Sequence, residues 1–148
     1  MNRLNGKVAV VTGGNAGIGE AIAKRFADEG ASVVVTGRRQ SELDRVVKIL
    51  QQGNGKVLAV AGSVTDEKHV QDVVRKTVDS FGRIDILVNN AGLGDFGKRL
   101  HETDDATWSM VLDINLTGVF RMTRVIGPLM LKQGRGAIVN ISSVASLV

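Results

Sequence analysis

The sequence predicts a doubly wound α/β fold, in which helices cover both faces of a parallel sheet. Short apolar runs alternate along the chain with amphipathic segments of about ten or more residues, as expected of strands joined by crossover helices. Within each run the apolar residues are largely consecutive, which is typical of a strand buried on both faces. The chain also contains 18 glycines in 148 residues. They predict backbone conformations, or close approaches to a ligand, that only glycine allows.

The hydrophobic pattern places each element in order. Strands are predicted at residues 7–12, 32–36, 56–61, 83–89 and 136–142. Helices are predicted at residues 17–29, 41–52, 66–80 and about 103–132, with Gly30 and Gly53 ending the first two. Pro128 lacks an amide proton, so we expect a kink or a broken last turn there. The apolar side chains of the last strand are expected at an uncovered edge of the sheet.

Length and composition describe one folded domain. The 148 residues suffice for one hydrophobic core but not for a second domain, and 43% hydrophobic with 23% charged residues excludes a disordered chain. The absence of cysteine excludes disulfides and a thiol nucleophile, and favours a reducing compartment. The polar N-terminus resembles neither a signal peptide nor a membrane span, so we expect a cytoplasmic protein.

Charge and histidine content narrow the range of ligands. The net charge of +4 comes from scattered Lys and Arg, and only 3% of residues are aromatic, so we expect neither a nucleic-acid nor a membrane partner. A small anionic ligand suits this mild basicity. No metal site is predicted, because His69 and His101 lack other ligands at suitable spacing; both are expected on the surface.

A glycine-rich turn directly follows the first predicted strand. Residues 12–19 read T-G-G-N-A-G-I-G and open the first helix. Gly13 would permit the tight turn, Gly17 the close approach of a pyrophosphate, and Gly19 the packing of helix on strand. The alternative is a connecting loop that is merely rich in glycine. The position between strand and helix favours a phosphate-binding turn.

This turn and three later motifs resemble the short-chain dehydrogenase/reductase family. Residues 89–92, N-N-A-G, resemble the motif after the fourth strand, and residues 113–116, D-I-N-L, resemble the segment with the catalytic Asn, here Asn115. Residues 136–143 resemble the strand that ends in the catalytic Ser, here Ser143. The resemblance implies a Rossmann-type NAD(P)-binding domain over residues 1–148. The residues expected to bind the cofactor are Gly13, Asn15, Gly17, Ile18, Gly19, Arg38, Arg39, Ser63, Val64, Asn90, Ala91 and Gly92.

The end of the second strand favours NADP(H) over NAD(H). An acidic residue at this place would accept hydrogen bonds from the ribose hydroxyls of NAD and repel a 2′-phosphate. The chain instead has Gly37 followed by Arg38 and Arg39. Two guanidinium groups can pair a phosphate. The alternative is that both arginines form the solvated start of the next helix. Ser63 stands where the family has an Asp that contacts adenine, which puts that contact in doubt.

The family's acid/base, a Tyr in a Tyr-x-x-x-Lys motif after the catalytic Ser, has no counterpart here, because the sequence contains no Tyr. The resemblance implies hydride transfer between NADP(H) and a small carbonyl or alcohol substrate by a homo-oligomer. The chain ends before that motif and before the family's later strands, so we expect the 148 residues alone to be inactive. The alternatives are a non-catalytic NADP(H)-binding module and a destabilised fragment.

Overall fold

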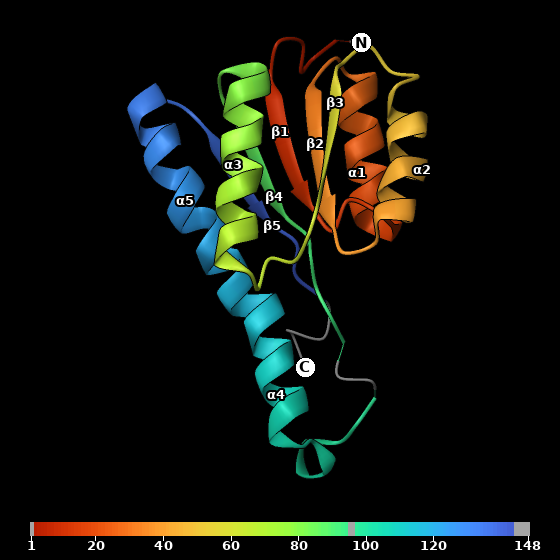
Figure 1. Ribbon diagram of the computed structural model, residues 1–148, viewed down its shortest axis with the longest axis vertical. Coiled ribbons are helices and arrows are strands. Elements are labelled where there is room, and N and C mark those ends of the chain that lie inside the picture. Colours follow the sequence, from red (N-terminus) through yellow and green to blue (C-terminus); the bar gives the residue numbers. More distant parts are fainter. Residues whose placement is uncertain (1, 95–96, 144–148) are drawn as a thin grey trace.

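The computed structural model describes residues 2–94 and 97–143, which contain a five-stranded parallel sheet in the order β3-β2-β1-β4-β5 (Figure 1). The strands are β1 Val8–Thr12, β2 Ser32–Gly37, β3 Val57–Ala61, β4 Ile86–Asn89 and β5 Ala137–Asn140. The helices are α1 Gly17–Asp28, α2 Gln40–Leu50, α3 Glu67–Phe81, α4 Asp105–Leu112 and α5 Gly118–Gln133. The strand order reverses beside β1, which confirms the predicted doubly wound fold.

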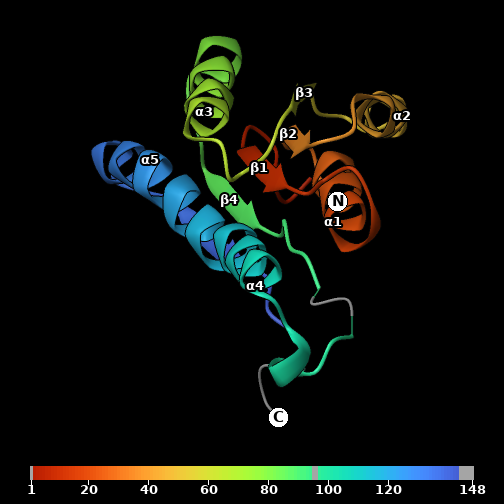
Figure 2. The same ribbon diagram turned by 60° about the horizontal axis from the view of Figure 1, so that its bottom comes forward.

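Two hydrophobic cores lie on opposite faces of the sheet. Helices α1 and α2 cover one face, whereas α3 and α5 cover the other (Figure 2). Successive residues of β1 point to alternate faces, so Val10 packs in the core beneath α3 and α5 and Val11 in the core beneath α1 and α2. Both faces of the central strands are therefore buried. This burial explains the consecutive apolar residues in the sequence.

Strand β5 differs from the central strands because all four of its residues are exposed. It pairs with β4 and ends the sheet, with Ile138 and Val139 39% and 44% exposed. The prediction of an uncovered edge is confirmed for the described residues.

The long helix predicted at residues 103–132 is interrupted, but not where the sequence suggested. Helix α4 begins after Asp104, whose carboxylate accepts a hydrogen bond of 2.7 Å from the Thr107 amide. A π-helical turn, Asp113–Thr117, then joins α4 to α5. The predicted broken turn at Pro128 is wrong, because α5 continues through it to Gln133. Because proline has no amide N–H, the carbonyl of Arg124, four residues earlier, lacks its usual helical donor.

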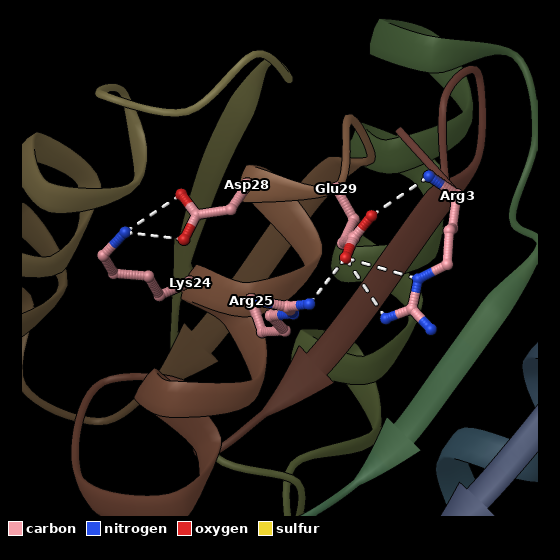
Figure 3. Close-up of polar contacts among 5 residues, drawn as sticks. All are labelled: Arg3, Lys24, Arg25, Asp28 and Glu29. Atoms are coloured by element: carbon pink, nitrogen blue, oxygen red, sulfur yellow. Dashed lines mark hydrogen bonds and ion pairs between the residues drawn. The ribbon is translucent and has the colours of Figure 1, made fainter. Parts of the chain in front are cut away.

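Ion pairs close the amino-terminal edge of the sheet, where the strands begin. The carboxylate of Glu29, only 4% exposed, accepts hydrogen bonds from the backbone and guanidinium of Arg3 and from Arg25 (Figure 3). The backbone amide of Arg3, and then its side chain, lower the pKa of Glu29. The carboxylate of Asp85 is similarly buried. It accepts hydrogen bonds from the Arg83 guanidinium and, at 3.0 Å, from the Val8 amide. The chain is thus pinned where β1 and β4 start.

Candidate functional site

A cavity of about 350 Å³ opens at the carboxyl ends of β1, β2, β3 and β4. The last two residues of β2, the loops after these four strands and one residue of the π-helical turn line it. Nine of the twelve predicted cofactor-binding residues are among the lining residues: Gly13, Asn15, Arg38, Arg39, Ser63, Val64, Asn90, Ala91 and Gly92. Ligands of doubly wound sheets bind at this edge, beside the reversal of strand order. The fold therefore brings most of the predicted residues to one place.

The glycine turn has the geometry that its sequence suggested. Gly13 and Gly17 have φ values of +63° and +54°, in the left-handed region that favours glycine. A side chain on Gly19 would overlap the Gly13 carbonyl and the Asn90 amide, so α1 packs directly on the turn. Gly17, Ile18 and Gly19 are not among the lining residues of the cavity. They form the first turn of α1, and its N-cap residue, Ala16, supplies no side-chain cap. That helix end therefore presents backbone N–H groups.

Neutral side chains lock the loop after β4 against the glycine turn. The Thr12 hydroxyl accepts hydrogen bonds from the amides of Asn90 and Ala91, both at 3.0 Å. In return, the Asn90 side chain donates to the carbonyls of Thr12 and Gly13 at 3.0 and 3.2 Å. Four hydrogen bonds thus hold these two walls of the cavity at a fixed separation.

Arg38 and Arg39 line the cavity without carboxylate partners. Within residues 2–94 and 97–143, neither guanidinium takes part in an ion pair or hydrogen bond that the structure records. Arg45 on α2 shows the contrast, because Glu20 holds it at 2.7 Å and Glu42 at 3.0 Å. The hydrogen bond with Glu20 is the main cause that raises the pKa of Arg45. Arg39 also precedes the first residue of α2, so both interpretations of this pair remain compatible with its position.

Ser63 and Val64 line the cavity after β3, the strand next to β2. The Ser63 hydroxyl accepts a hydrogen bond of 3.2 Å from the Thr65 amide and lies 2.8 Å from the Thr65 hydroxyl. It therefore stabilises the turn that leads into α3, which Asp66 caps through the Lys68 amide at 2.9 Å. An additional contact from Ser63 to adenine remains a prediction.

The two predicted catalytic residues, Asn115 and Ser143, are not among the residues that line the cavity. Asn115 is in the π-helical turn, where its side chain accepts from the Leu93 amide and donates to the Leu93 carbonyl, both at 2.8 Å. It thus fixes the loop that follows β4, and its neighbour Ile114 lines the cavity. Ser143 follows β5 and is exposed. Their catalytic roles remain predictions.

The prediction that His69 lies on the surface is wrong. Its side chain is in the core, with 7% of the residue exposed, and burial lowers its pKa. The spacing of Val70, Val73 and Thr77 along α3 marks the buried face of that helix and could have revealed the position of His69. Six residues that line the cavity were not among the predicted cofactor-binding residues: Ala16, Thr36, Gly37, Gly62, Leu93 and Ile114.

Two further expectations concern metals and membranes. His101 is exposed, as predicted. Across the part of the chain that the structure describes, no three His, Asp or Glu residues gather as a metal site would require. None of the described helices combines the length and the hydrophobicity needed to cross a membrane.

The fold and sequence match known proteins. The profile of the short chain dehydrogenase family matches residues 7–148. The 3-oxoacyl-acyl-carrier-protein reductase FabG of Thermotoga maritima is 43% identical over 147 residues, which are 98% of this chain and 58% of the reductase. A metagenomic short-chain oxidoreductase in complex with NADP is 37% identical, with a TM-score of 0.90 over 95% of this chain and 64% of its own.

NAD+-bound xylitol dehydrogenase is 32% identical, with a TM-score of 0.92 over 98% of this chain and 56% of its own. The chain thus spans between 56% and 64% of the length of these three proteins. The family profile covers nearly all of the chain, and the cavity lies where doubly wound sheets bind nucleotides. The chain therefore belongs to the short-chain dehydrogenase family of oxidoreductases.

Proposed function

We propose that residues 1–148 form one NADP(H)-binding domain of an oxidoreductase that interconverts a carbonyl and an alcohol. The observation that carries the choice of cofactor is the cavity wall after β2, where Arg38 and Arg39 lack carboxylate partners among the described residues. Gly37 replaces the acidic residue that would favour NAD(H). A 2′-phosphate supplies the anion that this wall otherwise lacks.

The remaining walls suit the other parts of the cofactor. The first turn of α1 would hold the pyrophosphate at its N–H groups, with Gly13 and Gly17 providing the turn. Ser63 and Val64 would face the adenine, and the segment Asn90 to Gly92 the nicotinamide ribose. NAD(H) fits the same turn, so the residues after β2 decide between the two cofactors. Relatives of both kinds occur, one bound to NADP and one to NAD+.

The bound nicotinamide would supply or accept the hydride. The chain's own residues orient the reacting groups. Asn115 holds Leu93 through two hydrogen bonds, and in the proposed reaction it would also position a water for proton transfer. Ser143 would donate a hydrogen bond to the substrate oxygen, which stabilises the negative charge that develops there. The small-molecule substrate, the homo-oligomeric assembly and the cytoplasmic location stay predictions.

Replacing Arg38 with Ala tests the cofactor assignment. We expect the affinity for NADPH to fall about 10- to 100-fold, because a hydrogen bond between two charged groups is lost, while the affinity for NADH changes little. Fluorescence titration of both cofactors measures the two effects. Arg75→Ala is the matched control, since Arg75 pairs with Asp72 on the exposed face of α3. Unchanged NADPH affinity in Arg38→Ala would show that the phosphate does not bind at this wall.

The alternative is a non-catalytic NADP(H)-binding module. Both candidates predict that NADPH raises the melting temperature, because it binds only the folded state. They differ in turnover. Consumption of NADPH with a 3-oxoacyl thioester by the purified 148-residue chain would exclude the module, whereas binding without turnover would favour it for this chain.

A further inference from the structure

The buried imidazole of His69 lies directly behind the cavity wall that the loops after β2 and β3 form. It projects from the first turn of α3, between the ends of these two strands. Its Nε2 is 2.7 Å from the hydroxyl of Thr36, the penultimate residue of β2. The backbone of Ala61, the last residue of β3, also interacts with the ring and partly offsets the lowering of the His69 pKa. One side chain thus links both strand ends.

The residues next to the imidazole leave room for it and enclose it. Gly62 has a φ of +153°, and any side chain there would overlap the imidazole of His69. The Gly62 amide donates to the Gly37 carbonyl at 2.9 Å, so the two loops are also joined beside the ring. Thr36 itself is 1% exposed and has its hydroxyl in reach of the imidazole. Water cannot easily replace this hydrogen bond.

Thr36 extends the connection to the glycine turn. Its carbonyl accepts the Gly14 amide at 3.1 Å, while its side chain contacts His69. The residue therefore holds three loops together: the glycine turn, the segment of Gly37 to Arg39, and the turn at Gly62 to Val64. These are the walls assigned above to the pyrophosphate, the 2′-phosphate and the adenine. The imidazole supports all three from behind without lining the cavity.

We infer that His69 is a positioning residue that holds the adenosine half of the NADP(H) site in its binding geometry, by accepting the Thr36 hydroxyl at Nε2 and donating Nδ1–H to the Ala61 carbonyl. The inference rests on the proposed NADP(H) site. The neutral ring has one donor and one acceptor, which match a hydroxyl on one side and a carbonyl on the other. Burial, which lowers the pKa of His69, favours this neutral form.

The tautomer is the first test and requires no cofactor. Long-range ¹H–¹⁵N correlation spectra of the ¹⁵N-labelled protein at neutral pH distinguish the two ring nitrogens. We expect a protonated Nδ1 and an unprotonated Nε2 for His69, with exposed His101 as the internal reference. A ring protonated at Nε2 would overturn the assigned directions of both hydrogen bonds, and with them the inference.

The second test measures affinity for 2′,5′-ADP, which contains only the adenosine half of the cofactor. Thr36→Val keeps the size of the side chain but leaves Nε2 without its donor, and His69→Leu removes both ring nitrogens. We expect each variant to bind 2′,5′-ADP about tenfold more weakly in calorimetric titrations, because one buried hydrogen bond is lost. The affinity for NADP+ should fall by the same factor, since neither substitution changes the part of the site that binds the nicotinamide half.

Two control variants separate positioning from general stability. Thr77→Val removes a buried hydroxyl on α3 that donates to the Val73 carbonyl at 2.6 Å and does not line the cavity. This variant should have a lower melting temperature but unchanged affinities for 2′,5′-ADP and NADP+. His69→Gln retains an acceptor for Thr36, so its affinity should recover to within about threefold of wild type.

The outcomes distinguish the two proposals. If wild type binds 2′,5′-ADP and NADP+ while Thr36→Val and His69→Leu bind them equally well, the positioning role is wrong and the proposed cofactor site stands. The same holds if Thr77→Val weakens binding as strongly as they do. If wild type binds neither compound, the proposed function is wrong, and the positioning role falls with it.

Discussion

The amino-terminal and carboxyl-terminal ends of the strands, called here the amino-terminal and carboxyl edges, use polar groups in opposite ways. At the amino-terminal edge, the buried carboxylates of Glu29 and Asp85 are each surrounded by guanidinium groups and backbone amides. At the carboxyl edge, neutral side chains such as Thr12 and Asn90 fix the loops by hydrogen bonds. The guanidinium groups of Arg38 and Arg39 remain there without carboxylates among the described residues.

The difference separates stability from binding. Charges that are already paired contribute to the fold and have little capacity left for a ligand. Charges without partners, on loops held rigidly by neutral hydrogen bonds, can bind an anion without first breaking an ion pair. Substitutions at the amino-terminal edge should therefore change stability alone, while substitutions at the carboxyl edge should change cofactor affinity.

The largest effect is expected from Gly19→Val, a substitution at the carboxyl edge. Its side chain would overlap the Gly13 carbonyl and the Asn90 amide, so α1 must move away from the glycine turn. We expect a loss of about 3 kcal/mol in the free energy of unfolding and no detectable NADPH binding. Urea denaturation and fluorescence titration check both effects. In the control Gly127→Ala, in α5 and away from the cavity, the new Cβ meets nothing within 4 Å, so neither stability nor NADPH binding should fall. Equal behaviour of the two variants would contradict the packing argument.

Asp85→Ala should give the corresponding result at the amino-terminal edge. It removes the acceptor of the Val8 amide and leaves Arg83 without its ion pair. We expect the free energy of unfolding to fall by about 3 kcal/mol, because a buried partner is removed. Under conditions in which the variant is fully folded, its affinity for NADPH should not change. A weakened affinity in this variant would show that the two edges are coupled.

Glu29→Gln should have a smaller and pH-dependent effect. Since the pKa of Glu29 is lowered in the folded protein, its stabilisation is complete above the unfolded pKa of about 4.3 and is lost as the pH falls through the lower folded value. The variant should therefore melt several degrees below wild type at pH 7, and the difference should disappear in strongly acidic buffer. A difference that grows on acidification would refute this assignment.

Lys24→Ala should have the smallest effect. Lys24 pairs with Asp28 one helical turn away, and both side chains are more than 40% exposed (Figure 3). Exposed pairs of this kind contribute little, so we expect the melting temperature to change by less than about 2 °C. A larger change, measured by circular dichroism, would mean that α1 depends on its exposed charges.

The sequence alone was sufficient for the sheet and for much of the cavity, because both follow from local patterns. Consecutive apolar residues identified the strands, and the glycine turn identified the edge where a ligand binds. The helical spacing of α3 could have shown that His69 is buried, but not its contact with Thr36, which joins residues 33 positions apart. The π-helical turn was likewise hidden, since its residues have an ordinary helical pattern and Asn115 is held there by Leu93. At Pro128 the local rule predicted a broken last turn that does not occur, because α5 continues through this residue to Gln133.

The most direct test of the central claim is a side-by-side calorimetric titration of the wild-type protein with NADPH and NADH. The two guanidinium groups at the end of β2 should make NADPH bind at least about tenfold more tightly, and added salt should reduce that preference. Equal affinity for the two cofactors, or tighter binding of NADH, would contradict the assignment of Arg38 and Arg39 to the 2′-phosphate.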